Sequence, residues 1–280
     1  MVGHTVIRHL PSCSGRFICN CHSRFSGVGA CRICRKYPLA FMVDNYRDTI
    51  NPEQIIVGIM INSLQQKWYR LMAKQLRRPS GILANLTGNQ MNISNDALYK
   101  LVISQLALKE GDHLLEIGFG NGKFFPELYE NAGRILISGV DLSNEMVTQA
   151  IKNNPSLYKC GRLRLQVGSS ERLPFEDACF DKIICINVIY FWEVPDVHLK
   201  EIYRVLKPGG MFFTGFRPAE TMIKLPFTQY GFNLYSEEDW YRILSNNGFG
   251  AISSARTGSR KQVQSGLTLE LDGICMQAKR

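Results

Sequence analysis

The stretch from His113 to Gly122 constrains the fold of this chain more than any other part of its sequence. It begins with His-Leu-Leu-Glu-Ile, a short apolar run typical of a buried strand, and continues directly into Gly-Phe-Gly-Asn-Gly. A helix is predicted next, through Phe124 to Tyr129. Glycines between a strand and a helix allow positive φ angles and let backbone N–H groups approach a ligand closely. The sequence therefore predicts an α/β fold with a ligand site beside this loop.

Further strands and helices follow in alternation, as in an open α/β sheet. Strands are predicted over residues 134–140, 162–167, 180–187 and 211–216, with two closing antiparallel strands over residues 250–256 and 267–277. Helices are predicted from Ser94 or Asn95 to Leu108, from Ser143, from Pro195 to Leu206 and from Glu237 to Asn247. These elements predict one domain over residues 94–280.

Polar residues stand where two of these strands end. Asp141 follows the second strand, a position from which a carboxylate can bind both hydroxyls of a ribose. Asn187 and Tyr190 stand at the carboxyl end of the fourth strand, where open sheets bind ligands. The glycine loop reads Gly-x-Gly-x-Gly, whereas a dinucleotide-binding loop would have a glycine in place of Lys123. This spacing speaks against an NAD-dependent oxidoreductase.

Five motifs in order carry a family resemblance: Leu114-Leu-Glu-Ile-Gly-Phe-Gly-Asn-Gly122, Gly139-Val-Asp-Leu142, Leu173-Pro-Phe175, Phe180-Asp181 and Leu206-Lys-Pro-Gly-Gly210. With them, residues 75–278 resemble the class I S-adenosylmethionine-dependent methyltransferases. The nearest likeness is to the small-molecule group typified by ubiquinone and menaquinone biosynthesis. The resemblance implies a Rossmann-like, mostly parallel seven-stranded sheet in the order 3-2-1-4-5-7-6, with helices on both faces. It also implies S-adenosylmethionine as cofactor and methyl transfer to a small-molecule acceptor.

The resemblance assigns cofactor-binding roles to individual residues. They are Glu116, Gly118, Gly120 and Gly122 at the methionine and ribose end, Asp141 at the ribose, Leu142 and Met146 beside the adenine, Ser169 and Ser170 at the adenine edge, and Asn187 near the sulfonium. The family often has Asp at the position of Ser169. A serine is shorter and uncharged, so the hydrogen bond to the adenine amine is expected to be weaker, or to come from Ser170 or a backbone group. Because a neutral hydrogen bond contributes only about 0.5–1.5 kcal/mol, binding should survive.

Catalysis makes small demands on the protein, because the methyl group of a sulfonium is already activated and positioning supplies much of the rate. The sequence offers no Ser-His-Asp array, and no metal site is predicted in the domain. Tyr190 is predicted to form a wall of the acceptor site or to donate a hydrogen bond to the acceptor. His198 is a candidate general base, although a histidine inside a helix more often faces solvent. The apolar, aromatic segment 218–235 either covers a flat or apolar acceptor or packs against the sheet.

The first 55 residues differ in composition from the rest. Residues 1–43 contain six Arg and Lys and no Asp or Glu, so they supply most of the net charge of +9. We expect a disordered leader; a mitochondrial transit peptide and a zinc site at Cys19-x-Cys21 and Cys31-x-x-Cys34 are the alternatives. The other cysteines form no disulfide framework, which favours a reducing compartment: the cytoplasm, or the mitochondrion if the leader is a transit peptide.

Residues 56–93 are expected to form a cover or lid region, in which residues 62–79 have helical periodicity. Leu64, Trp68, Leu71, Met72 and Leu76 fall on one face, and five cations occupy most of the rest. Three roles are open: a helix packed on the domain, a lid over the acceptor, or a helix lying on an anionic membrane surface. No run of 18 apolar residues is present, so no transmembrane segment is expected.

Rival functions make different demands on the sequence. A nucleic-acid methyltransferase would favour a basic core and an Asn-Pro-Pro-Tyr-type loop; residues 44–280 carry only about +3, and the loop reads Asn187-Val-Ile-Tyr190. Nucleic acid is therefore not an expected partner. A protein methyltransferase also remains open. A non-catalytic cofactor-binding scaffold would favour a damaged glycine loop or a missing ribose carboxylate, and both are intact here. A small apolar or aromatic acceptor is the function that these patterns favour.

Overall fold

The computed structural model describes residues 52–81, 83–262 and 268–280. The chain divides into two compact units, Met1–Ile59 and Met60–Arg280, and the whole sheet belongs to the second. The leader that was expected over residues 1–55, with its cysteines, lies outside the described residues except for its last four.

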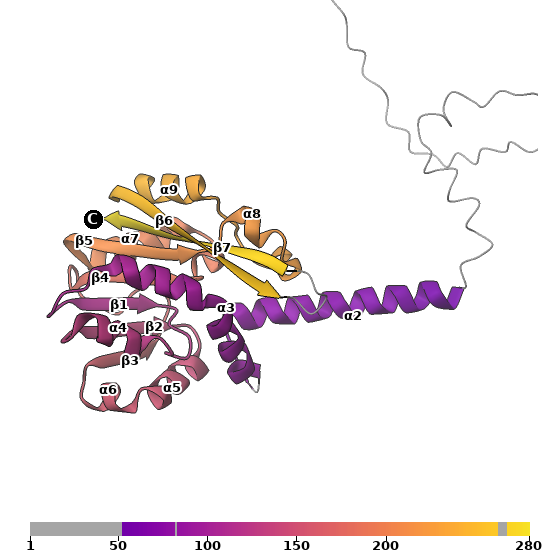
Figure 1. Cartoon of the computed structure of the whole chain (residues 1–280), viewed down its shortest axis with the longest axis horizontal. Helices are drawn as coiled ribbons and strands as arrows, with labels where there is room; N and C mark the ends of the chain where they lie inside the picture. Colours follow the sequence, from indigo (N-terminus) through magenta and orange to yellow (C-terminus); the bar gives the residue numbers. More distant parts are fainter. Residues whose placement is uncertain (1–51, 82, 263–267) are drawn as a thin grey trace, which may run out of the picture. The chain divides into compact units, whose positions relative to one another are not determined.

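A seven-stranded sheet forms the centre of the second unit, in the order β3-β2-β1-β4-β5-β7-β6 (Figure 1). The strands are β1 (His113–Ile117), β2 (Leu136–Asp141), β3 (Leu163–Val167), β4 (Phe180–Ile186), β5 (Leu206–Phe216), β6 (Gly250–Gln262) and β7 (Thr268–Lys279). Strands β1 to β5 are parallel, while β7 pairs antiparallel with both β5 and β6. The predicted fold and strand order are confirmed.

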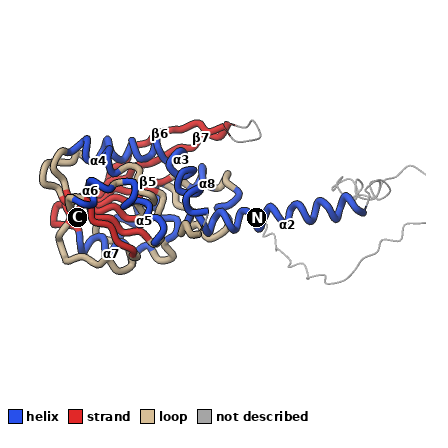
Figure 2. Tube along the Cα trace, turned by 90° about the horizontal axis from the view of Figure 1, so that it is seen from below, coloured by secondary structure: helices blue, strands red, loops and turns tan. Residues whose placement is uncertain are grey.

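Helices lie on both faces of this sheet. The helices of the described residues are α2 (Pro52–Arg77), α3 (Leu83–Leu106), α4 (Phe125–Ala132), α5 (Asn144–Asn153), α6 (Pro155–Lys159), α7 (Pro195–Val205), α8 (Ala219–Met222) and α9 (Glu237–Asn246), with short 3-10 turns η1 (Ile189–Phe191) and η2 (Pro226–Gln229). In Figure 2, α3 and α4 lie on one side of the strands and α7 on the other.

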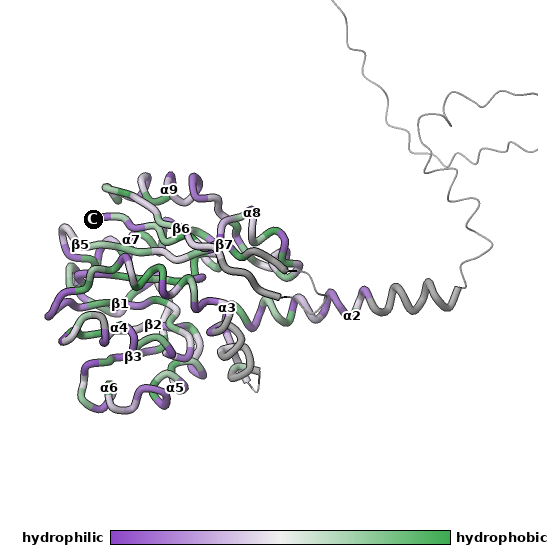
Figure 3. Tube along the Cα trace, in the orientation of Figure 1, coloured by the Kyte–Doolittle hydropathy of each residue, from purple (hydrophilic) through white to green (hydrophobic). Residues whose placement is uncertain are grey.

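Two apolar clusters correspond to the two faces. One joins α3, α4 and α5 to residues such as Leu114 and Ile184, and the other joins α7 and α9 to the neighbouring Leu115 and Ile183. Successive strand residues thus point to opposite faces, and both faces are buried. The interior strands accordingly show as mostly hydrophobic in Figure 3.

The N-terminal helices depart from the prediction at one point. Ser94 or Asn95 was expected to begin a helix, but α3 already begins at Leu83, so the predicted boundary between residues 93 and 94 falls inside it. Ser94 and Asn95 are good helix caps in isolation, yet the preceding residues continue the helix because they pack on the domain: Ala84 and Gly88 are buried. The predicted helix end at Pro79-Ser80-Gly81 is confirmed, since α2 stops at Arg77.

Candidate functional site

The glycine loop after β1 is closely packed at its two ends and open in the middle. Gly118, Gly120 and Gly122 all have positive φ, at 73°, 58° and 70°. A Cβ on Gly118 would lie 2.4 Å from Val188 Cγ2, and one on Gly122 would lie 2.8 Å from Ala150 Cβ. A Cβ on Gly120 would meet no atom within 4 Å. The loop therefore needs glycine at its ends for packing, while the space at Gly120 is free for a ligand.

Asp141, the last residue of β2, is buried beside this loop and held by backbone groups. Its Oδ2 accepts a hydrogen bond from Gly120 N at 2.9 Å, and its Oδ1 accepts one from Ser143 N at 2.8 Å. Burial raises the pKa of Asp141 to about 6, although both hydrogen bonds favour the carboxylate. Each oxygen keeps a second lone pair, so the carboxylate can still accept from two hydroxyls.

Ser143 links the surroundings of Asp141 to a segment much earlier in the sequence. Its side chain accepts from Met146 N and so caps α5, and its Oγ donates to the carbonyl of Pro79 at 2.5 Å. Gly88 of α3 also lies close, since a Cβ there would be 3.4 Å from Asn121 Nδ2 and 3.7 Å from Met146 Sδ. Pro79 therefore contacts the start of α5, and Gly88 lies beside both the glycine loop and α5.

Glu116 is buried in β1, two residues before the first glycine of the loop. Tyr99 of α3 donates its hydroxyl to Glu116 Oε1 at 2.8 Å. Burial raises the pKa of Glu116 to about 7, a direction opposed by the Tyr99 hydrogen bond and reinforced by the charge of Asp141. The sequence singled out Glu116 but not Tyr99, because nothing in the helical pattern of α3 distinguishes this ring from other core aromatics.

The loop after β3 brings together Ser170 and His198. Ser170 Oγ and His198 Nδ1 of α7 are 2.8 Å apart, and both side chains are buried. The imidazole is stacked on Trp192, with ring centroids 4.6 Å apart and an angle of 8° between the planes. Burial lowers the pKa of His198 to about 4, so the ring is neutral at physiological pH. The expectation that a histidine within this helix faces solvent is wrong, because the helix turns this side chain towards the sheet.

The other predicted adenine-side residues have contrasting environments. Met146 is a fully buried residue of α5, whereas Leu142, which directly follows β2, is exposed. Ser169 accepts a hydrogen bond from Glu171 N at 3.2 Å within its own loop.

At the end of β4, Asn187 is the centre of a second polar cluster. It has a positive φ of 58° and donates from Nδ2 to Asn95 Oδ1 at 2.9 Å. Its Oδ1 accepts from the Tyr190 hydroxyl at 3.1 Å, and that hydroxyl accepts from Arg217 N at 2.5 Å. Arg217 is itself buried and donates to the carbonyls of Ser94 and Leu271. Asn95 and Ser94 were expected only as helix caps, so their part in this cluster was missed.

The predicted residues thus fall into groups around the carboxyl ends of the strands. Glu116, the glycines and Asp141 lie together, and Asn187 and Tyr190 form the neighbouring cluster. His198 contacts Ser170 and not Tyr190, so the two candidates for catalysis belong to different groups. Among the described residues, no group of three His, Cys, Asp or Glu side chains could hold a metal ion, and none of the helices combines the length and the apolar character that a membrane span requires.

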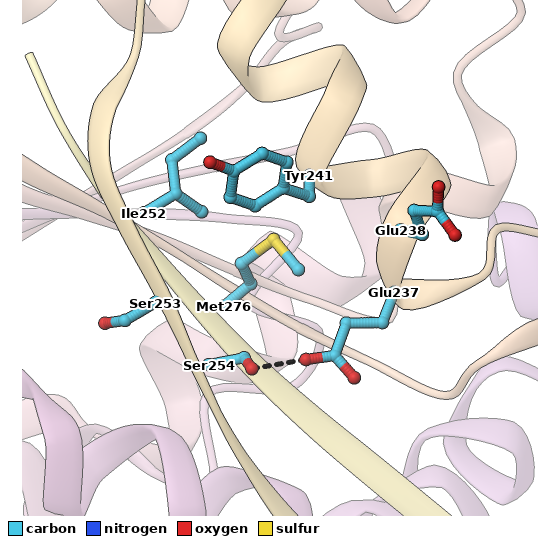
Figure 4. Close-up of a pocket in the computed structure, with 7 residues that line it drawn as sticks. All are labelled: Glu237, Glu238, Tyr241, Ile252, Ser253, Ser254 and Met276. Atoms are coloured by element: carbon cyan, nitrogen blue, oxygen red, sulfur yellow. Dashed lines mark hydrogen bonds between the residues drawn. The ribbon is translucent and has the colours of Figure 1, made fainter.

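A separate recess of about 390 Å³ lies between α9 and the strands β6 and β7 (Figure 4). Glu237 lines it, but its carboxylate already accepts hydrogen bonds from Ser254 and Arg256. None of the predicted site residues lines this recess. It is therefore distinct from the groups at the strand ends.

Comparisons with known proteins agree with this geometry. Residues 115–214 match the family described as "Methyltransferase domain". The uncharacterized methyltransferase YdaC of Bacillus subtilis is 32% identical over 135 residues, which cover 48% of this chain and 72% of YdaC. The chain is a class I S-adenosylmethionine-dependent methyltransferase. The identified family makes S-adenosylmethionine its cofactor, and the residues present fit that group: an open glycine loop and a carboxylate with free lone pairs lie side by side.

Other relatives of this methyltransferase extend the comparison. The ubiquinone/menaquinone biosynthesis C-methyltransferase UbiE of Rickettsia felis is 29% identical over 183 residues, covering 63% of this chain and 68% of UbiE. Among solved structures, a putative methyltransferase in complex with the Haloferax volcanii Trm112 methyltransferase activator has a TM-score of 0.60 at 19% identity, covering 69% of this chain and 92% of that chain. At this identity the structural likeness shows the fold alone.

Proposed function

We propose that this methyltransferase transfers the methyl group of S-adenosylmethionine to a small apolar or aromatic molecule. The observation that carries the proposal is a group of partly exposed phenylalanine rings, Phe191, Phe227 and Phe232, next to the Asn187 cluster. Phe232 lies 4.8 Å from Phe191, 5.9 Å from Tyr190 and 5.7 Å from Phe227, measured between ring centroids. Such rings suit a flat or apolar acceptor.

The segment that carries Phe227 and Phe232 is attached to η1 and Trp192 by hydrogen bonds. Asn233 N donates to the Tyr190 carbonyl at 2.8 Å, and Asn233 Nδ2 donates to the Trp192 carbonyl at 2.7 Å. The part of segment 218–235 around Phe232 therefore packs on η1. This attachment supports the interpretation of the segment as a wall of the acceptor site.

In this proposal, the cofactor-side residues hold S-adenosylmethionine and the Asn187 cluster shapes the reacting end. Asp141 would bind the ribose hydroxyls, the backbone at Gly120 would face the cofactor, and the loop of Ser169 and Ser170 would meet the adenine. The bound cofactor supplies an activated methyl group on a sulfonium. The protein's own part is to orient the acceptor and exclude water, with Tyr190 held by Asn187 and Arg217 at the acceptor wall.

Calorimetric titration with S-adenosylmethionine and with NAD, followed by a screen of phenols and quinols for S-adenosylhomocysteine release, tests this function. We expect binding of S-adenosylmethionine alone and turnover of at least one apolar acceptor. Phe191→Ala and Phe232→Ala should raise KM for that acceptor while leaving the cofactor Kd unchanged, and Tyr158→Ala on α6 serves as the matched control. Turnover of RNA or a protein, with no small acceptor turned over, would overturn the proposal.

A further inference from the structure

The helix α2 has an apolar stripe that the described part of the domain leaves uncovered. Leu64, Trp68 and Leu71 are spaced i, i+4 and i+7 and therefore share one face. Their exposed fractions are 66%, 55% and 38%. Further along the same helix Ala73 and Gln75 are buried, so packing on the domain accounts for the end of α2 and not for this stripe.

The sequence around the stripe supplies several cations and no acid. Residues 54–95 contain no Asp or Glu, and α2 carries Lys67, Arg70, Lys74 and Arg77, with Arg78 directly after it. Arg70 lies over the Tyr230 ring at 5.3 Å, and Arg77 pairs with Glu193 at 3.3 Å. Lys67 and Lys74 form no ion pair within the described part of the chain. Both stand three residues after a leucine of the stripe, so they flank it on the helix surface.

We propose that the stripe of Leu64, Trp68 and Leu71, with its flanking lysines, docks the protein on the surface of an anionic lipid bilayer. An interfacial helix combines an apolar face with Lys and Arg beside it, and a tryptophan is well suited to the boundary between headgroups and acyl chains. Each cation near such a surface adds to the attraction. The arrangement in α2 has all three features.

Charge argues against the other occupants of this face. A second copy related by two-fold symmetry would bring the same cationic helix against itself. The chain's own residues 1–43 carry six cations and no acid, so they too are repelled. Nucleic acid would neutralise the lysines but would leave the two leucines without an apolar partner. An anionic bilayer satisfies both the charge and the apolar surface.

Docking would also orient the catalytic domain. Because Arg70 lies on Tyr230, two residues from Phe232, the helix is joined to the segment that carries the acceptor wall. A docked α2 would hold that wall near the lipid phase, where apolar acceptors partition. This last step rests on the proposed function, whereas the docking itself does not.

Vesicle co-sedimentation of the full chain, with phosphatidylcholine alone or mixed with phosphatidylglycerol, tests the docking. We expect sedimentation with the anionic vesicles that decreases as salt is raised. Tryptophan emission gives a second signal: Trp192 and Trp240 are only 3% and 0% exposed, so a blue shift on binding would come from Trp68. The Trp68→Ser variant and the double variant Lys67→Glu/Lys74→Glu should each bind about tenfold more weakly or worse.

Control variants separate docking from loss of structure. Tyr158→Ser and Lys159→Glu on α6 remove an exposed aromatic ring and reverse an exposed charge, and they should bind vesicles like the wild type. All variants should keep the wild-type affinity for S-adenosylmethionine. Because cofactor binding is measured separately from vesicle binding, a failure of docking can be distinguished from a failure of the proposed function. Equal binding to neutral vesicles, no binding, or unchanged binding of the α2 variants would overturn the proposal. So would a dimer that dissociates on Trp68→Ser, or tRNA that binds through α2 in place of vesicles.

Discussion

The proposed cofactor side and the proposed acceptor side of this methyltransferase are built from different kinds of contact. Around Asp141, the partners are the backbone N–H groups of Gly120 and Ser143. Gly120 belongs to the loop after β1, and Ser143 stands two residues after the end of β2. Around Asn187, the partners are side chains and carbonyls from distant segments, such as Asn95 and the residues bound by Arg217. Backbone partners survive most sequence changes, whereas side-chain partners do not. The cofactor side is therefore suited to a constant ligand and the acceptor side to a variable one.

Gly122 offers the strongest test of the cofactor side. The change Gly122→Ala combines a positive φ with a Cβ 2.8 Å from Ala150 Cβ, so we expect the free energy of unfolding to fall by about 2–4 kcal/mol. Gly120→Ala is the matched control, because it has the same sign of φ but open space around the new Cβ. Urea denaturation measures stability and calorimetry measures cofactor affinity. Gly120→Ala should weaken cofactor binding but should lower the free energy of unfolding less than Gly122→Ala does. Equal stability of the two variants would contradict the packing argument.

Asp141→Asn should weaken S-adenosylmethionine binding by about 10–100-fold, since hydrogen bonds to a charged group contribute about 1.5–3 kcal/mol. Because burial raises the pKa of Asp141 to about 6, wild-type affinity should also fall as the pH drops below 6 and the carboxylate is protonated. Titrations at several pH values check both effects. The asparagine variant should show a flatter pH profile, and wild-type affinity in that variant would rule out the ribose assignment.

Tyr190→Phe tests the acceptor side in the same way. The change leaves Arg217 N without its acceptor and frees the Asn187 amide oxygen, so we expect kcat to fall about tenfold. The Kd for S-adenosylmethionine should stay close to that of the wild type. Steady-state kinetics and calorimetry together measure the two quantities. If the variant lost cofactor affinity and kept kcat, the division into two sides would be wrong.

The sequence predicted the structure best where the position of a residue is determined by the backbone. The glycine loop and the place of Asp141 were predictable because a strand end fixes which groups meet at the edge of a parallel sheet, whereas the strand order came from the family resemblance. The contacts of Tyr99, Asn95 and Ser94 were not, because α3 approaches the site through tertiary packing. Their helical pattern carries no information about which strand they face. The burial of His198 could have been predicted, because it stands four and seven residues before Ile202 and Val205 and shares their apolar face.

The pH dependence of stability tests the environment of Glu116, which lies in β1 and is bound by Tyr99 of α3. Its pKa is about 7 in the folded protein and about 4.3 in an unfolded chain. A raised folded-state pKa means that the folded protein binds more protons than the unfolded chain between these values. This contribution to stability is complete below about pH 4 and is lost as the pH rises through about 7. Denaturation across pH 4–8 should show a decline that Glu116→Gln reduces; an unchanged slope would exclude Glu116 as its source.

The smallest expected effect is at His198, and it decides between the two roles open to this residue. His198→Phe keeps a ring on Trp192 and removes the hydrogen bond to Ser170, so the cofactor Kd should rise only about 2–10-fold. Ser170→Ala removes the same bond, and the double variant should be no worse than either single one. Because the pKa of His198 is about 4, the loss should be the same at pH 6 and pH 8. A fall in kcat at unchanged Kd would make His198 a general base and move it to the acceptor side.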